Sequence, residues 1–257
     1  MILNYRKLEN GSPVGEPLVI LHGVFGSSDN WQTLGRQFAE KRTVFLVDQR
    51  NHGGSFHDEE FNYEVMAEDL LSLLKHEGLD RIDLMGHSMG GKTAMKFAST
   101  YSSMLRKLIV VDIAPRLYPP HHQQIFEAFD AVNLDTLKSR GEADEQMSTV
   151  LTDPGVKLFL LKNLKRTSDG FRWKVNLEVI KRNIEQVGKG LEAQDRYDGD
   201  TLFIGGGASD YIQAADHELI FKHFPKANIE MIADAGHWVH AVKPDELFEL
   251  ADGFLDA

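Results

Sequence analysis

The chain contains no cysteine among its 257 residues, which excludes disulfide bonds, thiolate metal ligands and a cysteine nucleophile. It also lacks an excess of basic residues, because 28 Lys and Arg stand against 39 Asp and Glu, a net charge of −11. A phosphate backbone binds to clustered positive charge, so we expect no nucleic-acid partner. No apolar run approaches the roughly 20 residues of a membrane helix, and the first residues, "MILNYRKLENG", lack the apolar core of a signal peptide. These absences predict a cytoplasmic protein without a membrane span.

What the chain does contain is an alternation of apolar runs with helical patterns. Runs typical of strands buried on both faces occupy 17–23, 43–49, 81–87, 107–113, 201–207 and 228–236. Helical periodicity occupies 63–77, 89–101, 214–223 and 244–255. This alternation predicts an α/β fold with a mostly parallel, doubly wound sheet.

The alternation stops in residues 115–190, a stretch too long for a structureless loop in a compact domain. It contains helical patterns at 121–132 and 154–165 and a hairpin-like turn at 166–176. We expect a helical cap at 115–190, inserted into a core domain formed by 1–114 and 191–257. The alternative is a set of additional helices packed beside the sheet.

Ser88 lies in a Gly-x-Ser-x-Gly frame, "GHSMG", with an apolar strand before it and a helical pattern after it. Glycines and serine are also ordinary turn residues, so the frame alone has a structural explanation. The strand–turn–helix context, however, is that of a nucleophile elbow, in which the hydroxyl projects from the carboxyl edge of a parallel sheet. We therefore interpret Ser88 as a nucleophile.

A serine hydroxyl is a weak nucleophile without an adjacent base. Among the 11 histidines, His237 stands out because "DAGHWVH" places it in a loop after the last predicted strand, at the sheet edge where ligand sites form. His237 and His240 together resemble a metal pair, but no third ligand has suitable spacing. We predict a general base at His237, no metal and no cofactor.

An acid that orients the base has two candidates. Asp112 ends the strand in "KLIVVD", and Asp210 follows the strand in "TLFIGGGASD". Both precede His237 in the chain, so their order does not separate them. Asp48 ends an earlier strand beside a turn and is interpreted as structural.

An oxyanion site requires inward-pointing N–H groups. The segment "LHGVFG" follows the first buried strand and contains glycines that allow its backbone to turn. We expect one donor at the N–H of Met89 and the other at Val24 or Phe25.

Taken together, "HGVFGSSDNW", "DQRNHGGS", "GHSMGG", "VVDIAP" and "AGHWVHAVKPDEL" resemble the α/β-hydrolase superfamily over essentially the whole chain. Within it, the chain is similar to the YbfF-type bacterial esterases. The resemblance implies a cap after the sixth strand and the hydrolysis of carboxylic esters, or of acyl-CoA thioesters, without a cofactor.

The resemblance also assigns residues. It matches Ser88 to the nucleophile and His237 to the base. Asp112 matches the acid of the subgroup, whereas Asp210 matches the position used in most of the superfamily; we favour Asp112. Ser209 is expected to make a further polar contact to His237.

The function predicted is a serine carboxylesterase that acts on a small-molecule ester through an acyl-enzyme. A C–C hydrolase, a lyase or a cofactor-free perhydrolase would use the same three residues, and a non-catalytic binding protein is a further alternative. Apolar residues of the cap are expected either to contact the substrate or to form the core of the cap: Phe126, Phe159 and Trp173.

Overall fold

The computed structural model describes residues 1–11 and 13–257. In these residues, seven strands form one sheet in the spatial order β1-β3-β2-β4-β5-β8-β9. Strand β1 pairs antiparallel with β3, and all other pairs in this sheet are parallel. The strands are β1 (Tyr5–Leu8), β2 (Leu18–Leu21), β3 (Val44–Val47), β4 (Ile82–His87), β5 (Leu105–Val111), β8 (Asp200–Gly206) and β9 (Ala227–Ile232).

Helices cover both faces of this sheet. They are α1 (Gln32–Phe38), α2 (Tyr63–Glu77), α3 (Met89–Thr100), α9 (His217–His223), α10 (Val239–Val242) and α11 (Pro244–Asp256), with short 3-10 turns at Ser28–Trp31, Ser102–Met104 and Ala214–Asp216. Helices α2 and α3 pack on each other on one face, and α1 and α11 on the other. The prediction of a mostly parallel, doubly wound sheet is confirmed.

Strands β2 and β4 lie in the middle of the strand order, and their residues are buried throughout. Such strands need apolar side chains on both faces, which "LVIL" supplies throughout and "IDLMGH" supplies apart from Asp83, Gly86 and His87. The Asp83 carboxylate accepts two hydrogen bonds from Arg106, at 2.9 and 2.6 Å. A buried charge is tolerated where it is paired in this way.

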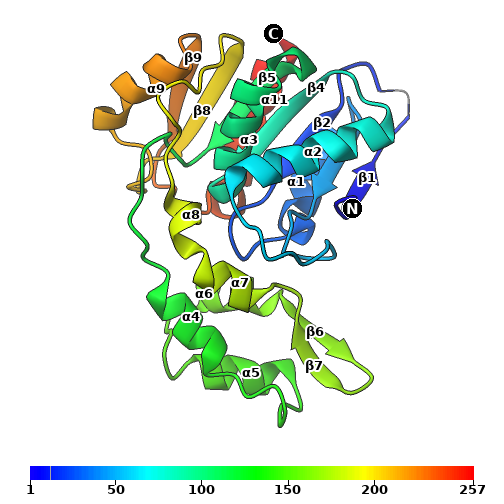
Figure 1. Cartoon of the computed structure of the whole chain (residues 1–257), viewed down its shortest axis with the longest axis vertical. Helices are drawn as coiled ribbons and strands as arrows, with labels where there is room; N and C mark the ends of the chain where they lie inside the picture. The colour runs from blue at the N-terminus through cyan, green and yellow to red at the C-terminus, as the bar shows by residue number, and fades with distance from the viewer. Residues whose placement is uncertain (12) are drawn as a thin grey trace.

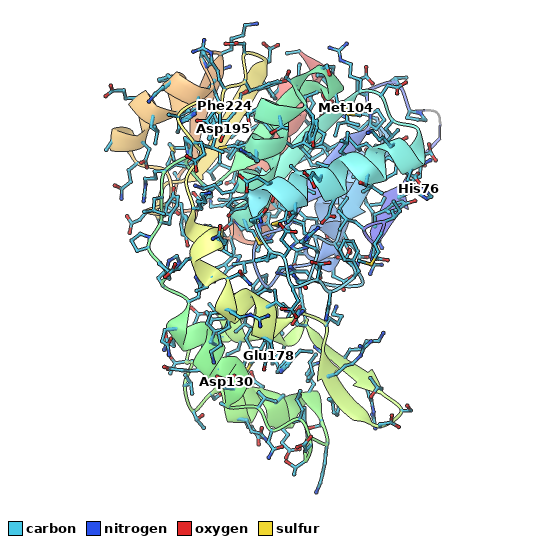
Figure 2. All side chains as sticks on the ribbon, viewed as in Figure 1. His76, Met104, Asp130, Glu178, Asp195 and Phe224 are labelled. Atoms are coloured by element: carbon cyan, nitrogen blue, oxygen red, sulfur yellow. The ribbon has the colours of Figure 1, made fainter. Side chains whose placement is uncertain are left out.

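Residues 115–190, which lie between β5 and β8, form a second layer, which we call the insertion; the other described residues form the sheet body. The insertion contains α4 (Gln123–Asp130), α5 (Arg140–Met147), α6 (Pro154–Leu161), α7 (Leu177–Arg182) and α8 (Ile184–Gly188), with a hairpin of β6 (Leu164–Thr167) and β7 (Gly170–Trp173). Figure 1 shows these elements together, apart from the layers of the sheet. In Figure 2, Asp130 and Glu178 lie on the insertion, whereas Asp195 and Phe224 lie on the sheet body.

The insertion begins after β5, the fifth strand along the part of the chain that the structure describes. The strand number implied by the resemblance, six, is therefore wrong by one for this chain. The place of the insertion in the sequence agrees with the prediction, because β5 corresponds to the strand predicted at 107–113.

Candidate active site

Ser88 occupies a sharp turn between β4 and α3. Its φ of 54° and ψ of −119° lie outside the regions that ordinary side chains favour. The glycines of the frame allow the turn to close. A Cβ on Gly86 would lie 2.1 Å from the Gly90 carbonyl oxygen, and a Cβ on Gly90 would lie 2.4 Å from the Leu21 oxygen. The Gly-x-Ser-x-Gly spacing is thus required by backbone packing.

Three predicted residues form one hydrogen-bonded chain. His237 Nε2 lies 3.1 Å from Ser88 Oγ, and His237 Nδ1 lies 2.8 Å from Asp112 Oδ2. A carboxylate only accepts, so the Nδ1–H donates to Asp112 and Nε2 is left to accept the serine proton. The arrangement has the order nucleophile, base and orienting acid.

Asp112 is fully buried directly after β5 and has a left-handed φ of 49°. Its other contacts satisfy the carboxylate. Oδ1 accepts from the Gly206 N–H at 2.9 Å, and Oδ2 accepts from Ser209 Oγ at 2.5 Å. Ser209 therefore contacts the acid, and the expected direct contact with His237 is corrected.

Asp210, the alternative acid, lies apart from His237. It is exposed, and its Oδ1 accepts from the side-chain amide of Gln213 at 3.3 Å. Its backbone carbonyl accepts from Arg116. This geometry does not support Asp210 as the orienting acid.

Tyr211 is a site residue that the sequence analysis missed. Its ring stacks on His237, with centroids 3.9 Å apart and planes at 18°. Its hydroxyl lies 2.6 Å from His121 Nε2, so the tyrosine connects the base to a side chain that precedes α4. Tyr211 belongs to none of the motifs considered. The sequence indicated it only by its position directly after Asp210 in "ASDY".

The expected oxyanion donors differ in availability. Among the described residues, neither Met89 N nor Val24 N has a hydrogen-bond acceptor. Phe25 N, in contrast, donates to His52 Nε2 at 3.1 Å. Phe25 is therefore excluded as a donor, which leaves Met89 and Val24.

Four buried histidines surround this site without forming part of the chain of three: His22, His52, His87 and His240. Burial lowers the pKa of His52 and of His240 to about 3, and it also lowers the pKa of His22 and, strongly, that of His87. Removing an imidazolium from water is unfavourable, so all four are neutral at neutral pH. His22, His52 and His87 act as packed, hydrogen-bonding rings, and His240 stacks on Trp31.

A pocket of about 280 Å³ opens above Ser88. Its apolar lining comes from both layers: Val24, Phe25, Trp31, Ile125, Val156, Phe159, Leu160 and Trp238. Two expected contacts are corrected, because Phe126 and Trp173 do not line it. Phe126 packs edge-on against Phe25 and is a buried core residue, whereas the partly buried Trp173 packs edge-on against Phe129 of the same hydrophobic cluster.

Within residues 1–11 and 13–257, no group of three or more His, Asp or Glu side chains could hold a metal ion. In the same residues, every helix is too short or too polar to cross a bilayer. The predicted cytoplasmic location stays a prediction.

The model of the alpha/beta hydrolase fold family matches residues 16–244. The chain belongs to this family. This α/β-hydrolase is 38% identical to a protein of Xenopus laevis named sn-1-specific diacylglycerol lipase ABHD11, over 97% of this chain and 83% of that protein. It is 37% identical to esterase YbfF of Escherichia coli strain K12, over 93% of each.

Among solved structures, the α/β-hydrolase matches one titled as a marine microorganism esterase. The TM-score is 0.95 at 39% identity, and the match covers 98% of this chain and 99% of that one. The predicted family and the enzyme class, an ester hydrolase of the α/β-hydrolase fold, are confirmed.

Proposed function

We propose that the protein is a serine carboxylesterase in which Ser88 is the nucleophile, His237 the general base and Asp112 the acid that orients the base. The observation that carries this proposal is the continuous hydrogen-bonded chain from Ser88 Oγ through both ring nitrogens of His237 to the buried Asp112. Asp112 fixes the tautomer of the ring and stabilises the imidazolium that forms when Ser88 loses its proton.

The reaction proceeds in two halves. Ser88 Oγ attacks the ester carbonyl while His237 takes its proton, and the oxyanion accepts hydrogen bonds from Met89 N–H and Val24 N–H. His237 then protonates the leaving alcohol, which gives the acyl-enzyme. Water, deprotonated by His237, attacks the acyl carbon, the bond from this carbon to Ser88 Oγ breaks, and His237 returns the proton to Oγ as the carboxylic acid leaves. No step uses a metal or a cofactor.

The substrate we propose is an ester with an apolar acyl group. Support comes from the apolar lining of the pocket and from its volume of about 280 Å³, at the lower end of ordinary ligand pockets. The names of the relatives, an esterase and a diacylglycerol lipase, fit a carboxylic ester. Acyl-CoA thioesters are the second class to test.

We further propose that residues 115–190 are a cap on a core domain formed by 1–114 and 191–257. Support comes from the pocket lining, because the insertion provides Ile125, Val156 and Phe159 to the side that faces Ser88. A cap in this position selects the acyl chain and excludes water from the reacting atoms.

A pre-steady-state assay with p-nitrophenyl esters of graded chain length tests the proposal. An acyl-enzyme predicts a burst of nitrophenol close to one equivalent of enzyme where deacylation is slow. Turnover of these esters without covalent capture of the acyl group, sought by acid quench and intact mass, would instead favour direct hydrolysis by water.

A further inference from the structure

The loop that carries the Val24 donor is connected by hydrogen bonds to a side chain of the insertion. Asn163, which follows α6 and is 2% exposed, donates from Nδ2 to the Phe25 carbonyl oxygen at 2.7 Å. The peptide group of that carbonyl also contains the Gly26 N–H, which donates to the Gly23 carbonyl oxygen at 3.0 Å. The peptide group of Gly23 in turn contains the Val24 N–H.

These contacts determine where the Val24 N–H points. The N–H and the C=O of a planar trans peptide point in opposite directions, so a donor that holds the Gly23 carbonyl also aims the Val24 N–H. The loop lies against the nucleophile, since a Cβ on Gly23 would be 3.2 Å from Ser88 Cβ. Hydrogen bonds arranged in series also polarise one another, which strengthens the terminal donor.

We infer that Asn163 is a positioning residue for the oxyanion site, acting through the Phe25–Gly26 and Gly23–Val24 peptide groups. The inference rests on the proposed function, in which Val24 N–H binds the oxyanion. Asn163 belongs to the insertion and Val24 to the sheet body. The oxyanion site is therefore complete only while the insertion is docked on the sheet body.

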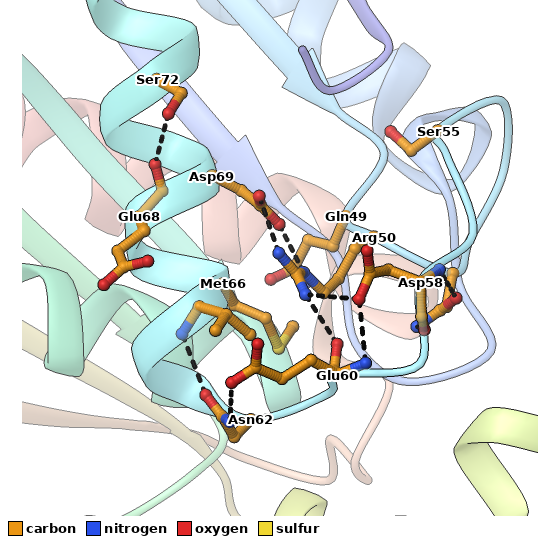
Figure 3. Close-up of polar contacts among 12 residues, drawn as sticks. Gln49, Arg50, Ser55, Asp58, Glu60, Asn62, Met66, Glu68, Asp69 and Ser72 are labelled. Carbon is orange, nitrogen blue, oxygen red and sulfur yellow. Dashed lines mark hydrogen bonds and ion pairs between the residues drawn. The ribbon is translucent and has the colours of Figure 1, made fainter. Parts of the chain in front are cut away.

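Other hydrogen bonds that hold the loop come from histidines of the sheet body. His52 accepts from Phe25 N, and His22 Nδ1 donates to the Gly23 carbonyl at 2.8 Å. The ring of His52 is itself held by the Arg50 carbonyl, and Arg50 donates twice to Asp69 of α2, at 2.6 and 2.9 Å (Figure 3). These hydrogen bonds lie within the sheet body. The Asn163 hydrogen bond to the Phe25 carbonyl, in contrast, forms only when the insertion is docked.

The backbone conformation of Phe25 explains why the loop needs a hydrogen bond from each layer. Its φ is 60°, a left-handed conformation that a bulky side chain adopts only when the surroundings enforce it. His52 holds its N–H and Asn163 its carbonyl, one from each layer. Without Asn163, the Phe25 carbonyl loses its side-chain donor, and the Phe25–Gly26 peptide group keeps the hydrogen bond from the Gly26 N–H to the Gly23 carbonyl.

The test compares Asn163→Ala and Asn163→Asp with Asn183→Ala. Asn183 is the matched control, because it is also an asparagine of the insertion whose Nδ2 donates to a backbone carbonyl. Its acceptor, Val179 at 2.9 Å, lies within the insertion and away from the oxyanion loop. Asn163→Asp keeps the size of the side chain but directs carboxylate oxygens at the Phe25 oxygen. For the smallest p-nitrophenyl ester, we expect kcat to fall about tenfold in Asn163→Ala and further in Asn163→Asp, with KM within threefold.

A trifluoromethyl ketone provides the readout that a merely structural role would not change. Its tetrahedral adduct with Ser88 places an oxyanion in the same site, so we expect its affinity to fall in step with kcat in both Asn163 variants. Asn183→Ala should leave kcat and ketone affinity within twofold of the wild type.

Unchanged kcat and ketone affinity in both Asn163 variants would overturn the inference, and so would a rise in KM alone. If the wild-type enzyme forms no ketone adduct, or if Ser88→Ala retains activity, the proposed function itself fails. The two failures are therefore distinguishable in one set of measurements.

Discussion

Asp112 Oδ2 and His237 Nδ1 lie 2.8 Å apart across the carboxyl edge of the sheet, although the two residues are 125 positions apart in the chain. This contact predicts a large loss of activity when the acid is substituted. Asp112→Asn should lower kcat by about 10³- to 10⁴-fold, because an amide no longer fixes the correct tautomer of the imidazole.

Asp210→Asn is the matched control for that substitution. The Asp210 carboxylate is exposed and contacts Gln213, so kcat should stay within about twofold of the wild type. Steady-state kinetics on one ester measures both variants. The reverse ranking would place the acid at Asp210 and leave Asp112 as a support of the strand end.

Ser209→Ala should have a moderate effect. The hydroxyl donates to the same Asp112 oxygen that accepts from His237, and its loss removes one hydrogen bond from a buried carboxylate. We expect kcat to fall about tenfold or slightly more, since a hydrogen bond to a charged group contributes at least about 1.5 kcal/mol. A loss as large as that of Asp112→Asn would show that Ser209 takes part in the reaction directly.

Phe159 and Phe126 should behave differently despite their common location in the insertion. Phe159 lines the pocket, whereas Phe126 is 4% exposed and packs on Phe25. Phe159→Ala should change the preference among acyl-chain lengths more than it changes turnover of the smallest ester.

Phe126→Ala, in contrast, should lower the free energy of unfolding by about 3 kcal/mol or more and leave the order of chain-length preference intact. Urea denaturation and an ester panel on both variants test the pair. Equal slowing of every substrate by Phe159→Ala would assign Phe159 to the core as well.

His240 makes the stability of the fold depend on pH. Its pKa is lowered to about 3 by burial, and its Nδ1 has no hydrogen-bond partner among the described residues. The unfolded chain, with an ordinary histidine pKa of about 6.5, binds a proton that the folded state does not. Stability is therefore fully present above pH 6.5 and falls by about 1.4 kcal/mol per pH unit, per such histidine, between pH 6.5 and about 3.

His240→Phe should remove this contribution, since the ring can keep its stacking on Trp31, whose centroid lies 4.6 Å away. Urea unfolding at pH 8, 7, 6 and 5 measures the effect. The variant should gain on the wild type as the pH falls below 6.5. A constant difference across this range would mean that His240 has the same pKa in the folded and unfolded states.

The nucleophile turn could be predicted from the sequence because its signal is local. An apolar strand, glycines at fixed spacing and a helical pattern are adjacent in the chain, and the clash that each glycine avoids lies within or beside the same turn. Helix α1 was missed for the opposite reason. Its Gly35 weakens the helical pattern, yet a Cβ there would lie 2.9 Å from the Leu46 side chain of β3, so the glycine allows α1 to pack closely on that strand.

The local sequence could not decide between two candidate residues for the same role. Val24 and Phe25 are equivalent oxyanion donors in the sequence, and what separates them is His52, 27 residues away, which occupies the Phe25 N–H. Asp112 and Asp210 both follow strand ends. Only the path of the loops in space turns Asp112 towards His237 and leaves Asp210 at the surface.

The central claim, that Ser88 carries the acyl group, is tested most directly by locating the covalent bond. The enzyme is treated with a fluorophosphonate, digested and analysed by mass spectrometry, with Ser88→Ala treated in parallel. We expect one adduct per chain on Ser88 in step with the loss of esterase activity, and no adduct and at least a 10⁴-fold lower kcat in Ser88→Ala. An adduct on another residue, or a Ser88→Ala variant that keeps a tenth of the activity, would contradict the account.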